Sequence, residues 1–220
     1  MSDRVLAQAR LLKVEVIQDL EAAVKAEAPD TINLEVYVAL LKLYQFHPSK
    51  ANFQLSSMIC MKALVLGLAE NCFAACIYLI PEKAYDRKEM RDLLKLHDLL
   101  ERSSFLEVWS NLTNYMDLAT QALGLPPSFP LESSIRRHVL NVMGATHTSM
   151  PLETFLSISH YRTMEGALAS PDVKAANIVF NAKLKVVEFP GGAAANIRAS
   201  GASMTDIPRL PQMAFLMSAN

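Results

Sequence analysis

A proline-rich break in the second half of the chain most constrains how this sequence can fold. The segment 124–130 reads GLPPSFP, with three prolines and one glycine in seven residues. Proline has no backbone N–H to donate and its ring clashes with the preceding helical turn, so a helix cannot pass through this segment. We therefore predict one domain over 1–130 and a second over 131–190.

Before the break, apolar residues recur at the spacing of amphipathic helices. The pattern predicts six helices, over 3–27, 33–46, 52–66, 70–80, 87–102 and 105–122. Ser104 followed by Glu107 is the pattern of a capping box and predicts where the last of them begins. Short links between such helices favour antiparallel pairs, so we expect 1–130 to be a HEAT-like helical repeat domain.

After the break, the pattern predicts short helices followed by strands. We expect a helix over 131–143 with Gly144 as its C-cap, and helices from about 149 to 158 and over 161–169. Runs of β-branched and aromatic residues at 178–180 and 184–189, around a short turn, predict a β-hairpin. Three helices and a hairpin are the order of a winged helix, so the predicted fold is mostly α with a small sheet.

The last thirty residues, 191–220, read as a tail that is first linker-like and then apolar. The apolar residues that it offers are Leu210, Met213, Phe215 and Leu216. Burial of several such side chains gives a favourable free energy, so we expect the tail to dock on a neighbouring subunit. Folding back on the winged helix, or remaining a disordered end, are the alternatives.

Charge and hydropathy exclude several classes of protein. Twenty-one Lys and Arg against 22 Asp and Glu leave a net charge of −1, which gives no field that attracts nucleic acid or an anionic membrane. The longest apolar stretch, Cys72 to Pro81, is far shorter than the roughly 20 residues that span a bilayer. With three cysteines and a charged, amphipathic start, the sequence predicts a cytoplasmic protein, or alternatively a nuclear one, without a membrane segment or disulfide framework.

No arrangement of reactive residues predicts catalysis. Cys72 and Cys76 stand four apart on one helix, but only Cys60 remains for a metal that needs four ligands, so we expect buried core thiols. His97 with its nearby carboxylates, Asp98 and Glu101, fits a solvated helix face. We predict no enzyme activity, no catalytic or metal-binding residues and no cofactor.

Four aromatic residues, Tyr44, Phe46, Phe105 and Trp109, could form a box that binds a peptide. Trp109 follows Phe105 by four residues, so both lie on one helix face. Because this is the spacing of residues that pack between helices, we expect all four in the helical core.

Three stretches resemble one family: LKLYQFHP (41–48), MKAL (61–64) and DLLERSSFLEVWSNLTNYMDL (98–118). They are similar to the K-subunit family of eukaryotic translation initiation factor 3, whose members join a helical repeat to a winged helix in a small PCI-like arrangement. The resemblance implies a non-catalytic scaffold subunit of this factor, acting on the small ribosomal subunit beside the L subunit. A PCI subunit of another complex, such as the proteasome lid, is an alternative.

A nucleic-acid-binding winged-helix regulator is a rival of a different class. The segment 131–190 carries six basic and five acidic residues, a net of 6 − 5 = +1, whereas binding to phosphates needs several uncompensated cations. We therefore expect no sequence-specific DNA binding. Weak RNA contact remains open, through Arg136, Arg137, Lys183 and Lys185.

The alternative use of a winged helix is protein docking along its sheet. An edge strand presents unpaired N–H and C=O groups that a partner strand can extend. We predict Leu184 to Phe189 as this edge, with Leu184, Val186 and Phe189 as candidate interface residues.

Overall fold

The computed structural model describes residues 13–190, so the predicted tail and the first twelve residues lie outside the described part. The described residues divide into two compact units, 13–139 with 156–162 and 140–155 with 163–190. Their fold is mostly helical with one small antiparallel sheet, which confirms the predicted fold class. The predicted domain boundary at 130 stays a prediction.

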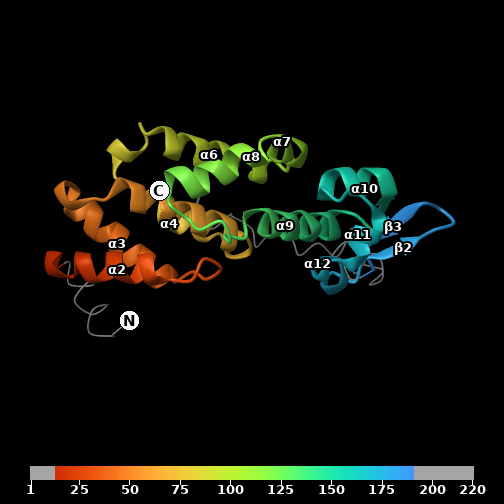
Figure 1. Ribbon diagram of the computed structural model, residues 1–220, viewed down its shortest axis with the longest axis horizontal. Coiled ribbons are helices and arrows are strands. Elements are labelled where there is room, and N and C mark those ends of the chain that lie inside the picture. Colours follow the sequence, from red (N-terminus) through yellow and green to blue (C-terminus); the bar gives the residue numbers. More distant parts are fainter. Residues whose placement is uncertain (1–12, 191–220) are drawn as a thin grey trace, which may run out of the picture. The chain divides into compact units, whose positions relative to one another are not determined.

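The first unit is built from helices joined by short links (Figure 1). In chain order these are α2 (Ile17–Ala26), α3 (Leu34–Phe46), α4 (Phe53–Leu66), α5 (Cys72–Ile77), α6 (Lys88–Glu101), α7 (Phe105–Ser110), α8 (Leu112–Asp117) and a π-helix (Leu118–Ala122). Single 3-10 turns lie at Val14–Val16, Pro48–Lys50, Leu68–Glu70 and Glu82–Ala84. The helices predicted over 33–46, 52–66 and 87–102 are therefore confirmed to within about a residue at each end.

Helix α4 is the centre of the first unit. Every residue from Ile59 to Val65 is buried, and the helix packs against α3, α5 and α6. At its end, Gly67 lets α5 approach, because a Cβ on this residue would lie 2.5 Å from the Cβ of Cys72. A helix that is apolar on all sides must be covered by neighbours on all sides, which explains why the others surround it.

Two tyrosines of α3 connect it to α2. The Tyr37 hydroxyl donates to the carboxylate of Glu27, and the Tyr44 hydroxyl donates to that of Glu21 at 2.6 Å. Because the earlier tyrosine bonds the later glutamate, α2 and α3 run antiparallel, as the short link between them predicts. Burial and the adjacent carboxylates raise the pKa of both phenols, so both keep their protons and remain donors.

A lysine of α4 binds one of the same carboxylates. Nζ of Lys62 lies 2.5 Å from Oε2 of Glu27 and 3.0 Å from the carbonyl oxygen of Ala28, and its side chain is 2% exposed. A buried ammonium is very costly unless acceptors take its protons. The carboxylate of Glu27 thus holds three successive helices in register, α2, α3 and α4.

The predicted helix over 105–122 is three separate pieces. Chain direction changes at Asn111 between α7 and α8, and the last turn widens into the π-helix. Ser104 precedes α7 but makes no side-chain cap, so the predicted capping box is wrong. Asparagines cap the helices that are better formed: Asn33 accepts from the Val36 N–H and Asn52 from the Leu55 N–H.

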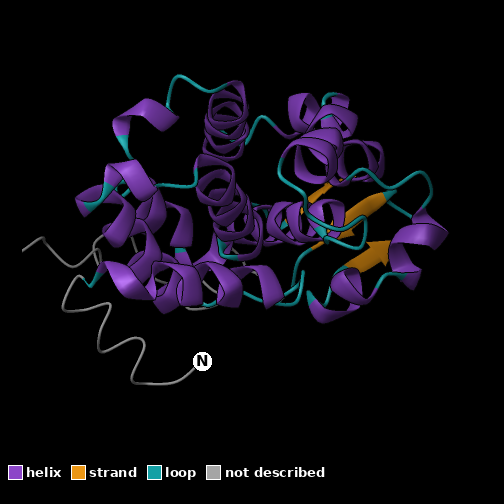
Figure 2. Ribbon diagram, turned by 60° about the vertical axis from the view of Figure 1, so that its left-hand side comes forward, coloured by secondary structure: helices purple, strands orange, loops and turns teal. Residues whose placement is uncertain are grey.

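The chain continues through α9 (Leu131–Thr146) into the second unit, which holds the sheet (Figure 2). The elements that follow are β1 (Ser149–Pro151), α10 (Leu152–Ser159), α11 (Met164–Ala169), α12 (Pro171–Ala175), β2 (Val179–Asn181) and β3 (Val186–Glu188). The order of helix, strand, two helices and hairpin is that of a winged helix, with a short extra helix before the hairpin. Gly144 lies inside α9, so the predicted C-cap is wrong.

The sheet has the strand order β1-β3-β2, with both pairs antiparallel. Val187 of β3 pairs with Met150 of β1 on one side and with Phe180 of β2 on the other. The last strand is therefore central, and the prediction that Leu184 to Phe189 forms an open edge is wrong. The sequence did not predict β1, whose three residues lack the β-branched pattern of a strand.

The buried ion pair gives the first testable prediction. Lys62→Met should lower the free energy of unfolding by about 3–5 kcal/mol, because it leaves the Glu27 carboxylate poorly compensated near the core. The double variant Glu27→Gln/Lys62→Met removes both charges while keeping an acceptor for Tyr37, so it should recover much of that loss. Urea unfolding of each variant measures the difference.

The matched control is Lys25→Met, which removes an exposed partner of Glu21 at 3.6 Å. A solvated pair of this kind contributes at most about 1 kcal/mol. Additive losses in the double variant, or equal losses for Lys62→Met and Lys25→Met, would contradict the assigned role of the buried pair.

Candidate functional site

The candidate interface residues of the hairpin are placed differently by the sheet. Leu184 lies in the turn before β3 with 68% of its surface exposed, whereas Phe189 is 2% exposed. The ring of Phe189 packs on Phe155, with centroids 6.3 Å apart, so it stabilises the second unit itself. Val186 is half-buried in the central strand. The tail candidates Leu210, Met213, Phe215 and Leu216 lie outside the described residues.

The four candidate RNA contacts are not equally available. Lys183 and Lys185 are exposed in the turn between β2 and β3, and Arg137 is exposed on α9. The side chain of Arg136, by contrast, is 18% exposed and binds the carboxylate of Glu132 one turn earlier. An arginine neutralised in this way releases few counterions when it meets a phosphate.

The three cysteines are buried and unoxidised, as predicted for core thiols. Burial raises the pKa of Cys60 well above its usual value and, with the nearby Cys72 thiol, raises that of Cys76 to about 12. At neutral pH both remain thiols, which are poor nucleophiles and poor metal ligands. No cluster of three or more metal-ligating side chains occurs within residues 13–190.

The charged run on α6 forms ordinary helix-surface pairs. Nε2 of His97 lies 3.7 Å from a Glu101 oxygen, and Asp98 binds Arg102 at 2.6 Å. The imidazole of His97 also packs on the ring of Phe73, with centroids 4.6 Å apart. These contacts fit the interpretation of a solvated helix face with ordinary pairs four residues apart.

Three of the four aromatic residues are in the core, as predicted. Tyr44, Phe105 and Trp109 are 0%, 5% and 7% exposed. Phe46 at the end of α3 is 60% exposed, so its predicted place in the core is wrong. The helical spacing of Phe46 is compatible with packing, but the helix ends at this residue and its side chain stays exposed.

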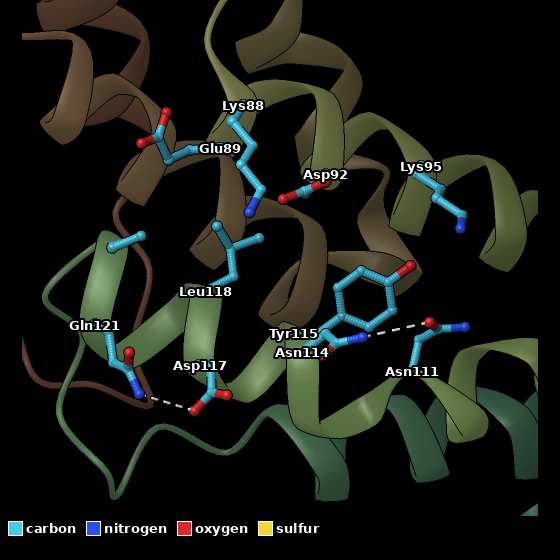
Figure 3. Close-up of a pocket in the computed structure, with 11 residues that line it drawn as sticks. Lys88, Glu89, Asp92, Lys95, Asn111, Asn114, Tyr115, Asp117, Leu118 and Gln121 are labelled. Atoms are coloured by element: carbon cyan, nitrogen blue, oxygen red, sulfur yellow. Dashed lines mark hydrogen bonds between the residues drawn. The ribbon is translucent and has the colours of Figure 1, made fainter.

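A polar cleft of about 610 Å³ lies between α6 and α8 (Figure 3). The ring of Tyr115 points from α8 toward α6, and burial with the nearby Asp92 and Glu107 carboxylates raises the pKa of its phenol. The side-chain amides on the lower wall in Figure 3 form hydrogen bonds with residues of their own helical segment. Gln121, for example, donates to the carboxylate of Asp117 at 3.1 Å. Lysines and carboxylates nearly balance, so the cleft favours water over a ligand of one charge.

A second hollow, of about 690 Å³, is lined by residues of α7, α9 and the end of α10, all within the first unit. We call it the tryptophan hollow. Its floor is Trp109, whose indole N–H donates to the Ile158 carbonyl at 2.7 Å and whose ring stacks on His160 at 4.9 Å. Leu106 stands on the rim, 60% exposed.

Arg136 holds one wall of the tryptophan hollow in place. Its Nε donates to the Ser159 carbonyl at 3.2 Å, and its guanidinium lies 4.7 Å from the centroid of the Tyr161 ring. These contacts fix the loop after α10, where His160 adopts a left-handed φ of 58°. The sequence analysis missed this site, although the aromatic and basic run His160-Tyr161-Arg162 was a signal for it.

The fold is thus of the mostly helical class, with a small antiparallel sheet whose elements follow the order of a winged helix. Known proteins similar to this chain are K subunits of eukaryotic translation initiation factor 3. The human and bovine proteins are each 32% identical over 134 residues, 60% of this chain and 58% of theirs. The zebrafish (Danio rerio) protein is 29% identical over 137 residues, 62% of this chain and 59% of its own.

These matches confirm the resemblance seen in the sequence: the chain is related to the K subunit of eukaryotic translation initiation factor 3. The matched part spans under three fifths of the length of these relatives, 58% for the human protein. No family model matches the chain. None of the helices within residues 13–190 is long and apolar enough to cross a membrane.

The packing of Trp109 gives the second prediction. Trp109→Ala should lower the free energy of unfolding by about 3–5 kcal/mol, the usual loss for a large buried aromatic side chain. Trp109→Phe keeps a ring but removes the donor to Ile158, and should lose about 1–2 kcal/mol. Urea unfolding measures both. As a control, Leu106→Ala on the exposed rim should change stability by no more than about 0.5 kcal/mol.

An unchanged unfolding midpoint for Trp109→Ala would show that the indole does not stabilise the first unit. Loss of partner binding without loss of stability would assign this ring to an interface instead.

Proposed function

We propose that this chain is a structural, non-catalytic subunit of eukaryotic translation initiation factor 3. In this role it helps to assemble the initiation complex on the small ribosomal subunit. The observation that carries the proposal is the similarity to the K subunit over 134 residues. The predicted family stretches at 41–48, 61–64 and 98–118 fall on α3, α4 and the α6–α8 region, which build the first unit.

The chemistry of the described side chains supports a role in binding rather than catalysis. The thiols of Cys60 and Cys76 are buried with raised pKa values, so they are poor nucleophiles. The exposed apolar side chains, which include Phe46, Leu106 and Leu184, give apolar area that is available to a partner protein. Scaffold subunits act through such surfaces, because assembly needs apolar area and not reactive groups.

The partners follow from the same resemblance. We propose the other subunits of the factor as direct partners, with the L subunit as the nearest, and the small ribosomal subunit as the platform. The residues 131–190 serve in this proposal as a winged-helix domain that docks on protein. Among residues 13–190, the β1 and β2 strands form the edges of its sheet, since β3 is paired on both sides.

Regulation through nucleic acid is less well supported. Arg136 is already bound to Glu132 and Tyr161, which removes one of the four cations that the sequence offered for RNA. The charge balance of +1 over 131–190 then rests on few exposed residues. Duplex binding near the non-specific level, with a Kd of about 10⁻⁴–10⁻⁶ M, is the most that such a surface supports.

Purification from cells tests the proposed function. The full chain, tagged at its own locus in its source cells and isolated under mild salt, should bring other subunits of the initiation factor with it. Mass spectrometry should find the L subunit among the most abundant, and sucrose gradients should place part of the chain with small ribosomal subunits. A proteasome-lid subunit carrying the same tag is the matched control.

Recovery of proteasome-lid or signalosome subunits without initiation-factor subunits would contradict the proposal. The chain would then be a subunit of a different complex.

The tail forms a separate proposal, because it lies outside the described residues. We propose that 208–217, with Leu210, Met213, Phe215 and Leu216, docks on a neighbouring subunit. A chain ending at Pro190 should melt like the full chain but lose partner subunits in reconstitution, since each buried apolar side chain contributes about 1.5–3 kcal/mol. Circular dichroism and size-exclusion chromatography measure the two effects.

Two outcomes would contradict the tail proposal. Normal assembly of the shortened chain would show that the tail is dispensable. A much lower melting temperature would place the tail in this protein's own core.

A further inference from the structure

We infer that the tryptophan hollow of the first unit is a docking site for a short segment of another protein that combines apolar anchor residues with an acidic side chain. This inference rests on the hollow alone and not on the proposed function, which names no site. Its volume of about 690 Å³ falls within the range of pockets that take drug-sized ligands, about 300–1,000 Å³. A few side chains of a peptide fit such a space.

Apolar contact is available at the rim and on one wall. Leu106 leaves 60% of its surface in water, and Leu156 on α10 is half-buried beside it in the lining. An exposed leucine at the mouth of a concave site is an anchor point, because covering it removes apolar surface from water at both partners. The side chain that enters should therefore be Leu, Ile, Phe or Met.

The charge of the hollow selects an acidic partner. Two arginines line it against one carboxylate, and that carboxylate, on Glu132, is bound by Arg136. Arg162 is exposed in the loop after α10, and no carboxylate of residues 13–190 forms an ion pair with it. An Asp or Glu of the partner would give Arg162 the counter-charge that residues 13–190 do not supply.

The same contacts disfavour RNA as the occupant. Recognition of single strands needs free aromatic faces on which bases stack. Here the indole of Trp109 stacks on one face of His160 at an angle of 11°, and the Arg136 guanidinium lies over one face of the Tyr161 ring, so each ring has at most one face left for a base. Among the lining residues, all of which lie within 13–190, Arg136 is also neutralised by Glu132, so Arg162 is the arginine that remains for phosphates.

The chain's own apolar tail is also a poor match in charge. The segment 208–217 contains Arg209 and no Asp or Glu. Asp206 just before this segment is offset by Arg209, so the stretch 206–217 has no net charge and offers Arg162 less counter-charge than a segment with an uncompensated Asp or Glu. The complementary occupant is therefore a segment of another protein.

Peptide selection on the full chain tests the inference. A phage-displayed library of random 16-residue peptides is selected against the protein, and enriched peptides are synthesised with a fluorescein label. We expect them to combine at least two of Leu, Ile, Phe and Met with Asp or Glu. In fluorescence anisotropy, Arg162→Glu and Leu106→Ser should each weaken their binding tenfold or more.

The matched controls place Glu or Ser at other exposed positions of the first unit. Arg91→Glu changes an exposed arginine of α6, and Met116→Ser changes a methionine of α8 that is 44% exposed. Neither lines the hollow, so both should bind the peptides within twofold of the unaltered chain. Thermal unfolding must show that all four variants remain folded.

Several results would overturn the inference. The first is a selection in which no enriched peptide depends on both Leu106 and Arg162 for binding. The second is a selection that enriches basic peptides. Binding of a labelled 12-nucleotide uridine RNA that Arg162→Glu abolishes, in place of peptide binding, would assign the hollow to RNA. Stronger competition by a peptide of residues 206–217 would assign it to the chain's own tail. None of these results bears on co-purification with the initiation factor.

Discussion

A single carboxylate, that of Glu27, fixes how the first helices of this protein lie against one another. It accepts from the Tyr37 hydroxyl and from the buried ammonium of Lys62, so α2, α3 and α4 meet at one point. Apolar packing alone would allow these helices to slide, because leucine surfaces have no direction. Two donors on one acceptor permit one register, and the rest of the first unit packs on α4 in that register.

The sequence predicted the elements whose cause is local. Apolar spacing was sufficient for α3, α4 and α6, and the β-branched runs were sufficient for the hairpin. It failed where the cause is distant in the chain. Nothing near Met150 indicates a strand, because β1 forms only when β3 is beside it, and this same pairing places β3 in the centre of the sheet. A buried Lys62 in an apolar helix was a signal of a hidden partner, but the partner, 35 residues away, was not visible.

The tryptophan hollow follows the same rule. Its floor and its wall come from residues about 50 positions apart, joined by the hydrogen bond from Trp109 to Ile158. The sequence analysis correctly predicted Trp109 in the core and counted Arg136 as a free cation. Both roles depend on the loop after α10, whose carbonyls Arg136 binds. A count of charges therefore overestimates the positive charge on the surface, since it cannot tell which arginines are occupied by hydrogen bonds to backbone carbonyls.

This use of arginine explains how a nearly neutral chain can still present a selective surface. Glu132 and Arg136 neutralise each other and fix the wall, which leaves Arg162 as the exposed charge of a hollow that an exposed leucine also lines. One cation beside one apolar anchor binds little nucleic acid, because phosphate binding grows with the number of cations. It does discriminate among protein segments, because a partner must pair with the charge and cover the apolar side chain at once. A segment that does only one of these leaves the other group of the hollow in contact with water and binds more weakly.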